Sequence, residues 1–330
     1  MHRRGDTEAL VYEEAPVPDL LPGDALVRVH AVGITPTELT WNSTYVTRKK
    51  KDRLPIMPGF EVAGTVERVA PDVTDVSVGE EVYGLLDFWR DGAAAEFVSA
   101  RASDLAPKPK SLSFTYAAAI PLSALTAWQS LFDYAKLSEG RTVLVHGAGG
   151  GVGTFAVQFA RWKGAHGFAT CSNVKVNLVR SLGAERVIDY TSTRFQDELS
   201  DLDVVLDTVG GEVLENSWNI LRRGGSLITI VGDAPEKKAA AYGVTGFSIL
   251  VEPNREELVE IARLVDAGEV KPVVDAIFPL TRAREAFERG LSGHNRGKTV
   301  LTTEGILSCS KISPATTAAP RTIRTCRMKG

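Results

Sequence analysis

The residues best suited to chemistry form a glycine-rich string at positions 147–153 within the segment TVLVHGAGGGVGTFAVQFARWKG. An apolar run at 143–145 leads into the string, and a segment with apolar residues at helical spacing follows it. In a strand, turn and helix in this order, glycines let backbone N–H groups and the helix N-terminus approach a pyrophosphate. The order therefore predicts a dinucleotide site at Gly150, Gly151, Val152 and Gly153, with a simple packing turn as the alternative.

The residues after the next predicted strand indicate which dinucleotide is bound. A carboxylate about 20 residues beyond the glycines usually accepts the ribose 2′-hydroxyl of NADH. Counting from Gly150 reaches Thr170, Cys171 and Ser172 instead, and Lys175 follows one helical turn later. A hydroxyl and an ammonium suit a 2′-phosphate. We therefore expect NADPH, although a capping serine and a solvated lysine would give the same letters.

Composition limits the class of protein. With 44% hydrophobic and 24% charged residues, the 330-residue chain predicts a globular protein with a sizeable core. A formal charge of −3 supplies no field for nucleic acid or anionic lipid. Three cysteines form neither a disulfide framework nor a metal cluster, and neither a signal peptide nor an apolar membrane span is evident. These features favour a cytoplasmic location.

The elements that position these residues follow two different patterns of apolar residues. Short apolar runs between residues 9 and 98, separated by PGD, PGF and VGE, predict a mostly β domain over residues 1–120. Its run RKKK at 48–51 fits a solvated loop or a phosphate patch. Continuous apolar strands alternating with amphipathic helices then predict a parallel sheet covered on both faces over 121–262. Residues 263–304 return to β-like segments that rejoin the first domain.

Residues 305–330 show no apolar period and no acidic residue. Such a segment buries little apolar surface and predicts a disordered tail. A basic arm for nucleic acid or a membrane surface is the alternative.

Collinear motifs run along most of the chain. They include GITPTEL, PGFEVAGTVERV, VGEEVYG, DGAAAEFVSA, AAAIPLSALTAWQSLF, HGAGGGVG, LGAERVIDY, LDTVGG, GGSLITIVG and RGKTVL. Over about residues 9–302 the chain resembles the medium-chain dehydrogenase/reductase superfamily, and more closely its zinc-free, quinone-oxidoreductase-like branch. The resemblance implies an α/β fold with a GroES-like β-barrel domain and a Rossmann domain, whose parallel sheet is doubly wound. It also implies a homodimer formed through the apolar segment at 242–251.

The resemblance also implies positions for the cofactor contacts. Thr126 would lie near the nicotinamide, and the loop at 150–153 at the pyrophosphate. Ser172, Lys175 and Tyr190 would surround the 2′-phosphate, and Val231 and Lys298 would lie toward the nicotinamide end. A surface lysine in the last strand is the alternative for Lys298, and His146 before the loop is expected to be structural.

Two departures from relatives concern the substrate side. Zinc-dependent members have a cysteine in the GITPTEL segment and a histidine in the PGF segment, where this chain has Thr35 and Phe60. Without those ligands no zinc ion polarises an alcohol oxygen. The quinone branch often carries an asparagine and, five residues on, a tyrosine, and here these positions are Thr35 and Thr40. Tyr45 is the nearby side chain that could donate a proton, with packing under the loop as the alternative.

The combined expectation is an NADPH-dependent, zinc-independent oxidoreductase that reduces a small quinone or α,β-unsaturated carbonyl compound by hydride transfer. A fold does not determine a reaction. Two alternatives therefore stay open: a non-redox biosynthetic enzyme for cyclisation or isomerisation, and an NADPH-binding protein without turnover.

Overall fold

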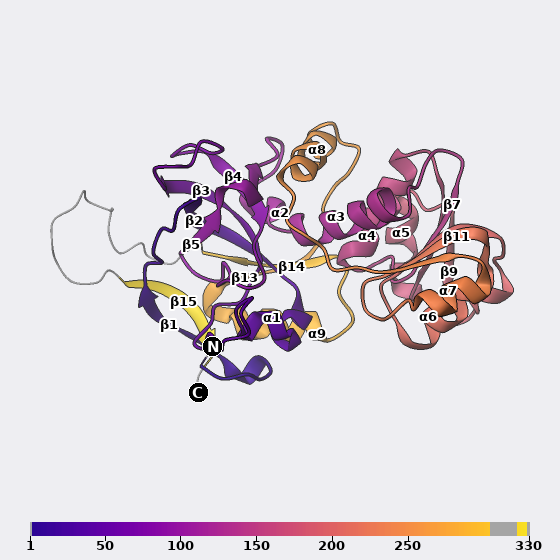
Figure 1. The fold of residues 1–330 in the computed structure, drawn as a ribbon, viewed down its shortest axis with the longest axis horizontal. Coiled ribbons are helices and arrows are strands. Elements are labelled where there is room, and N and C mark those ends of the chain that lie inside the picture. Colours follow the sequence, from indigo (N-terminus) through magenta and orange to yellow (C-terminus); the bar gives the residue numbers. More distant parts are fainter. Residues whose placement is uncertain (1, 304–321, 329–330) are drawn as a thin grey trace. The chain divides into compact units, whose positions relative to one another are not determined.

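The computed structural model describes residues 2–303 and 322–328 (Figure 1). The chain divides into two compact units. Unit 1 comprises Met1–Pro121, Pro253–Ala262 and Val274–Gly330, and unit 2 comprises Leu122–Glu252 and Arg263–Val273. The α-helix α8 (Arg255–Asp266) contributes residues to both units. In the described ranges no helix is long and apolar enough to cross a membrane.

Unit 1 is built on a seven-stranded sheet in which the order is β13-β14-β2-β3-β4-β6 and β5 also pairs with β2. The pairs are antiparallel except for β13 and β14. Strand β2 is mostly buried along its length, which accounts for its near-continuous apolar sequence. The β-rich first domain expected from the sequence is therefore confirmed. The strands are β2 (Asp24–Ile34), β3 (Glu61–Val69), β4 (Glu81–Leu85), β5 (Phe97–Arg101), β6 (Leu105–Pro107), β13 (Val274–Pro279) and β14 (Lys298–Thr302).

Short elements surround this sheet. They are η1 (Thr7–Ala9), η2 (Pro36–Thr40), α1 (Asn42–Tyr45), η3 (Ala102–Asp104), α2 (Phe114–Ala117), η8 (Leu280–Arg282) and α9 (Ala283–Leu291). A separate two-stranded sheet joins β1 (Leu10–Pro16) to β15 (Thr322–Met328), with Leu10 opposite Met328 and Pro16 opposite Thr322. Residues Thr322–Met328 thus differ from the disordered tail expected over 305–330, because backbone pairing to an edge strand needs no apolar pattern. The rest of that expectation, at 305–321 and 329–330, lies outside the described residues.

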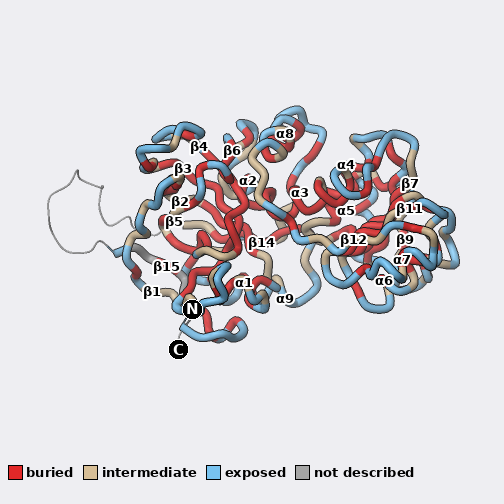
Figure 2. Tube along the Cα trace, in the orientation of Figure 1, coloured by how far each residue is buried: buried red, intermediate tan, exposed pale blue. Residues whose placement is uncertain are grey.

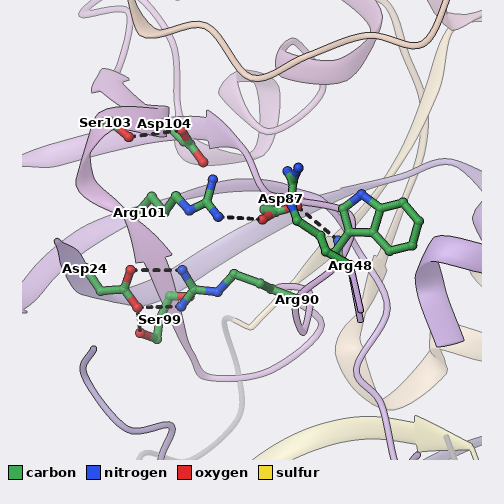
Figure 3. Close-up of polar contacts among 9 residues, drawn as sticks. Asp24, Arg48, Asp87, Arg90, Ser99, Arg101, Ser103 and Asp104 are labelled. Carbon is green, nitrogen blue, oxygen red and sulfur yellow. Dashed lines mark hydrogen bonds and ion pairs between the residues drawn. The ribbon is translucent and has the colours of Figure 1, made fainter. Parts of the chain in front are cut away.

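An ion-pair network anchors the loop between β4 and β5 (Figure 3). The guanidinium of Arg90 forms a bidentate pair with the carboxylate of Asp24, which also accepts a hydrogen bond from Ser99 Oγ at 2.8 Å. Burial opposes ionisation of Asp24, yet the hydrogen bonds from Arg90 and Ser99 hold its pKa below the ordinary value. Asp87 pairs with Arg48 and Arg101 in the same region. These contacts explain why a charged loop is ordered beside the sheet.

Unit 2 contains a six-stranded parallel sheet in the order β12-β11-β10-β7-β8-β9. The strand order reverses between β7 and β10, and ligands of open α/β sheets bind at the carboxyl ends of the strands at such a point. The predicted doubly wound sheet is therefore confirmed. The strands are β7 (Thr142–Val145), β8 (His166–Cys171), β9 (Arg186–Asp189), β10 (Leu202–Asp207), β11 (Leu221–Thr229) and β12 (Thr245–Ser248).

Helical segments precede and connect these strands (Figure 1). They are α3 (Pro121–Trp128), the π-helical turn η4 (Gln129–Tyr134), α4 (Gly151–Trp162), η5 (Asn173–Lys175), α5 (Val176–Ser181), η6 (Phe195–Asp197), α6 (Gly211–Ser217), η7 (Trp218–Ile220) and α7 (Glu236–Tyr242). The central strands are buried, and the outer helix faces are exposed (Figure 2). Leu144, Val205 and Leu227 meet Trp218 in one apolar cluster, so three adjacent strands and the segment after α6 share a core.

Candidate functional site

The glycine loop lies between β7 and α4, as its sequence predicts. Gly147 has a φ of +66°, a conformation that glycine adopts without a steric penalty. The loop is closed by hydrogen bonds from Gly150 N to Gly147 O at 2.9 Å and from Ala148 N to Thr170 O at 3.0 Å. Gly150 is the N-cap residue of α4, and among the described residues no side chain caps this end of the helix. The first N–H groups of α4 are therefore left to bind an anion.

Two glycines of this loop differ in how closely other atoms surround them. A Cβ atom added to Gly153 would lie 2.4 Å from Gly147 O and 2.5 Å from Ala148 Cα, so Gly153 allows the helix to pack on its own loop. Apart from atoms of Gly150 itself and its two chain neighbours, a Cβ added to Gly150 would have a single atom of the described residues within 4 Å, Gly147 O at 3.3 Å. The loop therefore fits a pyrophosphate, because it leaves room at the open end of the helix.

The three residues expected around a 2′-phosphate follow β8 and β9, two neighbouring parallel strands. Ser172 and Lys175 share a turn in which Lys175 N donates to Ser172 O at 2.9 Å. A Cβ added to Gly149 would lie 2.5 Å from Lys175 Cδ, so the aliphatic stem of Lys175 packs over the glycine loop. Tyr190 N donates to Cys171 O at 3.2 Å, and the Tyr190 side chain is 62% exposed. The fold thus brings a hydroxyl, an ammonium and a phenol to one edge of the sheet.

The ends of β10 and β11 complete this edge. The buried carboxylate of Asp207 accepts hydrogen bonds from Val209 N at 3.0 Å, Gly210 N at 2.9 Å and Thr229 Oγ1 at 2.8 Å. It therefore holds the two strand ends together. Val231 follows β11 and is 53% exposed, and its Cγ2 would lie 3.2 Å from a Cβ added to Gly210. An apolar side chain is thus displayed beside the loop after β10.

His146 and Thr126 have internal partners in unit 2. His146 is fully buried, with Nδ1 2.9 Å from Thr170 Oγ1 and Nε2 3.1 Å from Ser217 Oγ. Because Ser217 Oγ donates to Val213 O, His146 Nε2 is assigned as the donor to Ser217. Burial lowers the pKa of His146 to about 4, so the ring stays neutral at pH 7. Thr126 is 4% exposed, and its hydroxyl donates to Leu122 O at 2.6 Å within α3.

Unit 1 holds a second group of polar residues, at the start of β14. Lys298 Nζ forms an ion pair with Glu61, the first residue of β3, and donates to Thr35 Oγ1 at 3.0 Å. The side chains of Lys298 and Glu61 are 6% and 1% exposed. The surface lysine considered as an alternative is therefore wrong. The ammonium of Lys298 binds Glu61 and Thr35, both in unit 1, and Thr35 is the residue before η2.

Glu38 is a further buried acid near this pair. Its Oε1 accepts from Gly59 N at 2.8 Å, while its Oε2 has no hydrogen-bond partner in the described part of the chain. Burial raises the pKa of Glu38 to about 8, and nearby Glu61 acts in the same direction, although Gly59 N–H and Lys298 oppose them. Glu38 is therefore predominantly protonated at pH 7. The group then carries one ammonium and one carboxylate, with no net charge.

The contacts of Tyr45 match the alternative of packing under the loop. The side chain is 3% exposed, and its hydroxyl donates to Leu39 O at 2.6 Å. Burial also raises the pKa of this hydroxyl, against smaller opposing effects of Gly5 and Arg4. Tyr45 therefore packs under η2. The phenol of Tyr45, in α1, supplies the hydrogen-bond donor for the carbonyl of Leu39, in η2.

The two positions that bear zinc ligands in relatives are occupied by other chemistry. Phe60 is fully buried, and its ring lies 6.3 Å from that of Trp41 and 5.2 Å from that of Phe88. Thr35 accepts from Lys298. Neither a thiolate nor an imidazole is present at these positions, so this donor set does not fit zinc. Residues 2–303 and 322–328 contain no cluster of three or more His, Cys, Asp or Glu side chains that would hold a metal ion.

Three buried acids, Glu38, Glu61 and Asp207, were not predicted from the sequence. Each interrupts an apolar segment, in GITPTEL, PGFEVAG and VVLDTVG. An acid inside an apolar run is costly unless it is paired or hydrogen-bonded, and this was the available signal. Each of them also has a partner more than 20 residues away, in Gly59, Lys298 and Thr229 respectively, and these pairings were not readable from spacing.

Comparisons with known proteins agree with this architecture. Residues 21–110 match the family described as alcohol dehydrogenase GroES-like domain, and residues 182–301 match the family described as zinc-binding dehydrogenase. A probable mitochondrial zinc-binding oxidoreductase of Arthroderma benhamiae is 35% identical over 89% of this chain and 93% of its own length. A chloroplastic NADPH-dependent alkenal/one oxidoreductase of Arabidopsis thaliana is 32% identical over 86% of this chain and 73% of its own length. The structure of a quinone oxidoreductase from Coxiella burnetii superimposes with a TM-score of 0.83 at 30% identity, covering 90% of this chain and 96% of that one.

Proposed function

This chain belongs to the medium-chain dehydrogenase/reductase superfamily, and we propose that it is an NADPH-dependent oxidoreductase that reduces a quinone or an α,β-unsaturated carbonyl compound. The observation that carries the proposal is Lys175, whose stem packs over the glycine loop one helical turn after residues 170–172, the positions at which an NADH-binding relative would place an acid. The named activities of the Arabidopsis thaliana and Coxiella burnetii proteins support the choice of substrate class.

The chain's own residues divide the task of holding NADPH. The N–H groups at Gly150, Gly151, Val152 and Gly153 would bind the pyrophosphate, since no described side chain caps this end of α4. Ser172, Lys175 and Tyr190 would bind the 2′-phosphate by hydrogen bonds and by the charge of the ammonium. Thr126 and Val231 are proposed to lie toward the nicotinamide. When bound, reduced nicotinamide supplies the hydride.

We propose that the reaction uses no zinc. The positions equivalent to the ligands carry Thr35, held by Lys298, and the buried ring of Phe60. Elemental analysis of the purified protein tests this point. Stoichiometric zinc retained after dialysis against a chelator would contradict it.

Turnover is tested by following the absorbance of reduced nicotinamide with matched pairs of substrates. Each enone is compared with the corresponding saturated ketone, and each quinone with its hydroquinone. We expect oxidation of NADPH with enones or quinones and none with the saturated or reduced partners. Consumption of substrate without NADPH would instead indicate non-redox chemistry, and absence of any turnover would contradict the proposed activity.

The choice of NADPH is tested by Lys175→Glu. Replacing the ammonium by a carboxylate beside the 2′-phosphate should lower the kcat/KM ratio of NADPH to NADH by about 10-fold or more, since each 1.4 kcal/mol is tenfold. Lys237→Glu makes the same charge change on an exposed residue of α7 and serves as the control. An unchanged ratio in Lys175→Glu would show that this ammonium does not select the cofactor.

Location and assembly are also proposals. The small number of cysteines favours a reducing compartment, and we propose the cytoplasm, although the two named relatives are described as mitochondrial and chloroplastic. Imaging of the tagged chain tests this. A homodimer through the edge strand β12 is proposed as well, and light scattering on the purified protein measures its mass.

A further inference from the structure

The polar group at the start of β14 contains a hydroxyl with a defined hydrogen-bond direction. An ammonium carries three donors and no acceptor, so Thr35 Oγ1 must accept in its 3.0 Å contact with Lys298 Nζ. The proton of Thr35 is then left for another acceptor. Within the described part of the chain this hydroxyl donates to no other residue, and Thr35 is partly exposed.

The ammonium that holds Thr35 is itself fixed. Lys298 is bound to the buried carboxylate of Glu61, and both side chains are more than nine-tenths buried. Lys298 therefore has no freedom to swing into solvent as a surface lysine would. A hydroxyl that accepts from a cation becomes a stronger donor, because hydrogen bonds in a chain polarise one another.

We propose that Thr35 donates a hydrogen bond to the carbonyl oxygen of the substrate, and that Lys298 and Glu61 are positioning residues that orient and polarise its hydroxyl. This inference rests on the proposed function. It replaces the expectation that Lys298 itself contacts the nicotinamide end, because the ammonium is buried and is bound to Glu61 and Thr35 Oγ1.

The proposed role fits the electron balance of an enone reduction. As hydride adds to the β-carbon, the C=C π electrons shift toward the α-carbon and the carbonyl π electrons move onto oxygen. The resulting enolate oxygen carries the negative charge that the Thr35 hydroxyl stabilises. A proton from water then reaches the α-carbon, so the C=C bond is reduced by one hydride and one proton, and Thr35 returns unchanged.

The central experiment compares Thr35→Val with Thr35→Ser. Valine has nearly the shape of threonine and suits the extended backbone at this position, where φ is −112° and ψ is 104°. Loss of one donor to a developing oxyanion typically lowers kcat by about 10²- to 10³-fold, and we expect a loss of that size in Thr35→Val. Thr35→Ser should recover most of it, and the dissociation constant for NADPH should be unchanged in both variants.

The positioning role is tested by a double-mutant cycle. Lys298→Met combined with Glu61→Gln removes both charges and leaves no unpaired buried ion, so the pair of changes spares the fold. If the pair acts through Thr35, it should lower kcat in the parent chain but have no further effect on kcat in the Thr35→Val background. Thr74→Val, an exposed change elsewhere in unit 1, is the control.

The outcomes separate the two proposals. Wild-type turnover of enones with an unaffected Thr35→Val would overturn this inference and leave the proposed function in place. An equal loss from the Lys298 and Glu61 changes with and without Thr35 would overturn the positioning role. A wild-type chain that reduces neither enones nor quinones would overturn the proposed function and the inference together.

Discussion

At the level of single residues, the glycine loop separates the requirements of folding from those of binding. Gly153 has backbone atoms of its own loop within 2.5 Å of a hypothetical Cβ, whereas a Cβ on Gly150 would meet a single carbonyl oxygen at 3.3 Å. Both glycines belong to one motif, yet only Gly153 is needed by the fold. Their substitutions should therefore have different consequences.

We expect Gly150→Ala to fold normally and to bind NADPH more weakly, because the new methyl group occupies the space proposed for the pyrophosphate. Gly153→Ala should lower the free energy of unfolding by about 1–3 kcal/mol, since overpacking forces the loop to move. Thermal unfolding and NADPH titration of both variants measure this. Normal NADPH affinity in a folded Gly150→Ala protein would contradict the proposed pyrophosphate site.

Tyr45 illustrates a polar residue that serves packing. Removal of its hydroxyl in Tyr45→Phe leaves Leu39 O without the donor now at 2.6 Å, which should cost about 1–2 kcal/mol of stability. We expect kcat to remain near that of the parent chain. Urea unfolding and steady-state kinetics check the two parts, and a loss of kcat of about 100-fold without loss of stability would restore Tyr45 as a proton donor.

At the level of elements, Glu38 ties η2 to the turn before β3 through Gly59 N. Its pKa is raised from 4.5 to about 8, chiefly by burial. Below pH 4.5 the carboxyl is protonated in both the folded and unfolded states. As pH rises further, the unfolded chain releases the proton first, so the stabilisation from neutral Glu38 falls by up to about 1.4 kcal/mol per pH unit and is lost once pH passes 8.

This sign gives a direct test with Glu38→Gln, which keeps a neutral group of the same shape. The free energy of unfolding of the parent chain minus that of Glu38→Gln should decrease from pH 5 to pH 8 and then level off. Urea unfolding at several pH values measures the difference, in which other titrating groups largely cancel. A difference that rises with pH would show that Glu38 is ionised in the native state.

At the level of the whole molecule, the strand near the end of the chain, β15, belongs to unit 1 and not to unit 2. Strand β15 pairs with β1 over seven residues and bridges Ala95 through Thr325, which is fully buried. All of these residues belong to unit 1. Removing β15 would expose one edge of β1 and uncover neighbouring core residues.

We therefore expect a chain ending at residue 321 to lose a few kcal/mol of stability in unit 1, at about 0.5–1.5 kcal/mol per lost hydrogen bond. NADPH affinity, assigned to unit 2, should persist at temperatures where both forms are folded. Unfolding followed together with NADPH fluorescence separates the units. An unaltered unfolding transition would show that β15 contributes nothing in solution.

Much of the fold was predictable because its signals are local. Contiguous residues predict the strand before Gly147 and the helix after Gly150. They also predict the alternation of buried strands with amphipathic helices. Each pattern reflects the geometry of one element, so no knowledge of distant contacts is required. For the same reason, the candidate cofactor residues Ser172 and Lys175 were identified from their distance after the glycines.

The polar partners of unit 1 depend instead on contacts between distant segments. Lys298 meets Thr35 across 263 positions, and β15 reaches β1 across more than 300 positions. The sequences around Lys298 and Tyr45 do not distinguish a buried side chain from an exposed one. Sheet topology determines which distant strands become neighbours, and a buried charge or hydroxyl acquires its role from those neighbours. The architecture and the glycine loop therefore follow from the order of residues alone, whereas the placement of Lys298, Glu61 and Tyr45 follows from strand pairing.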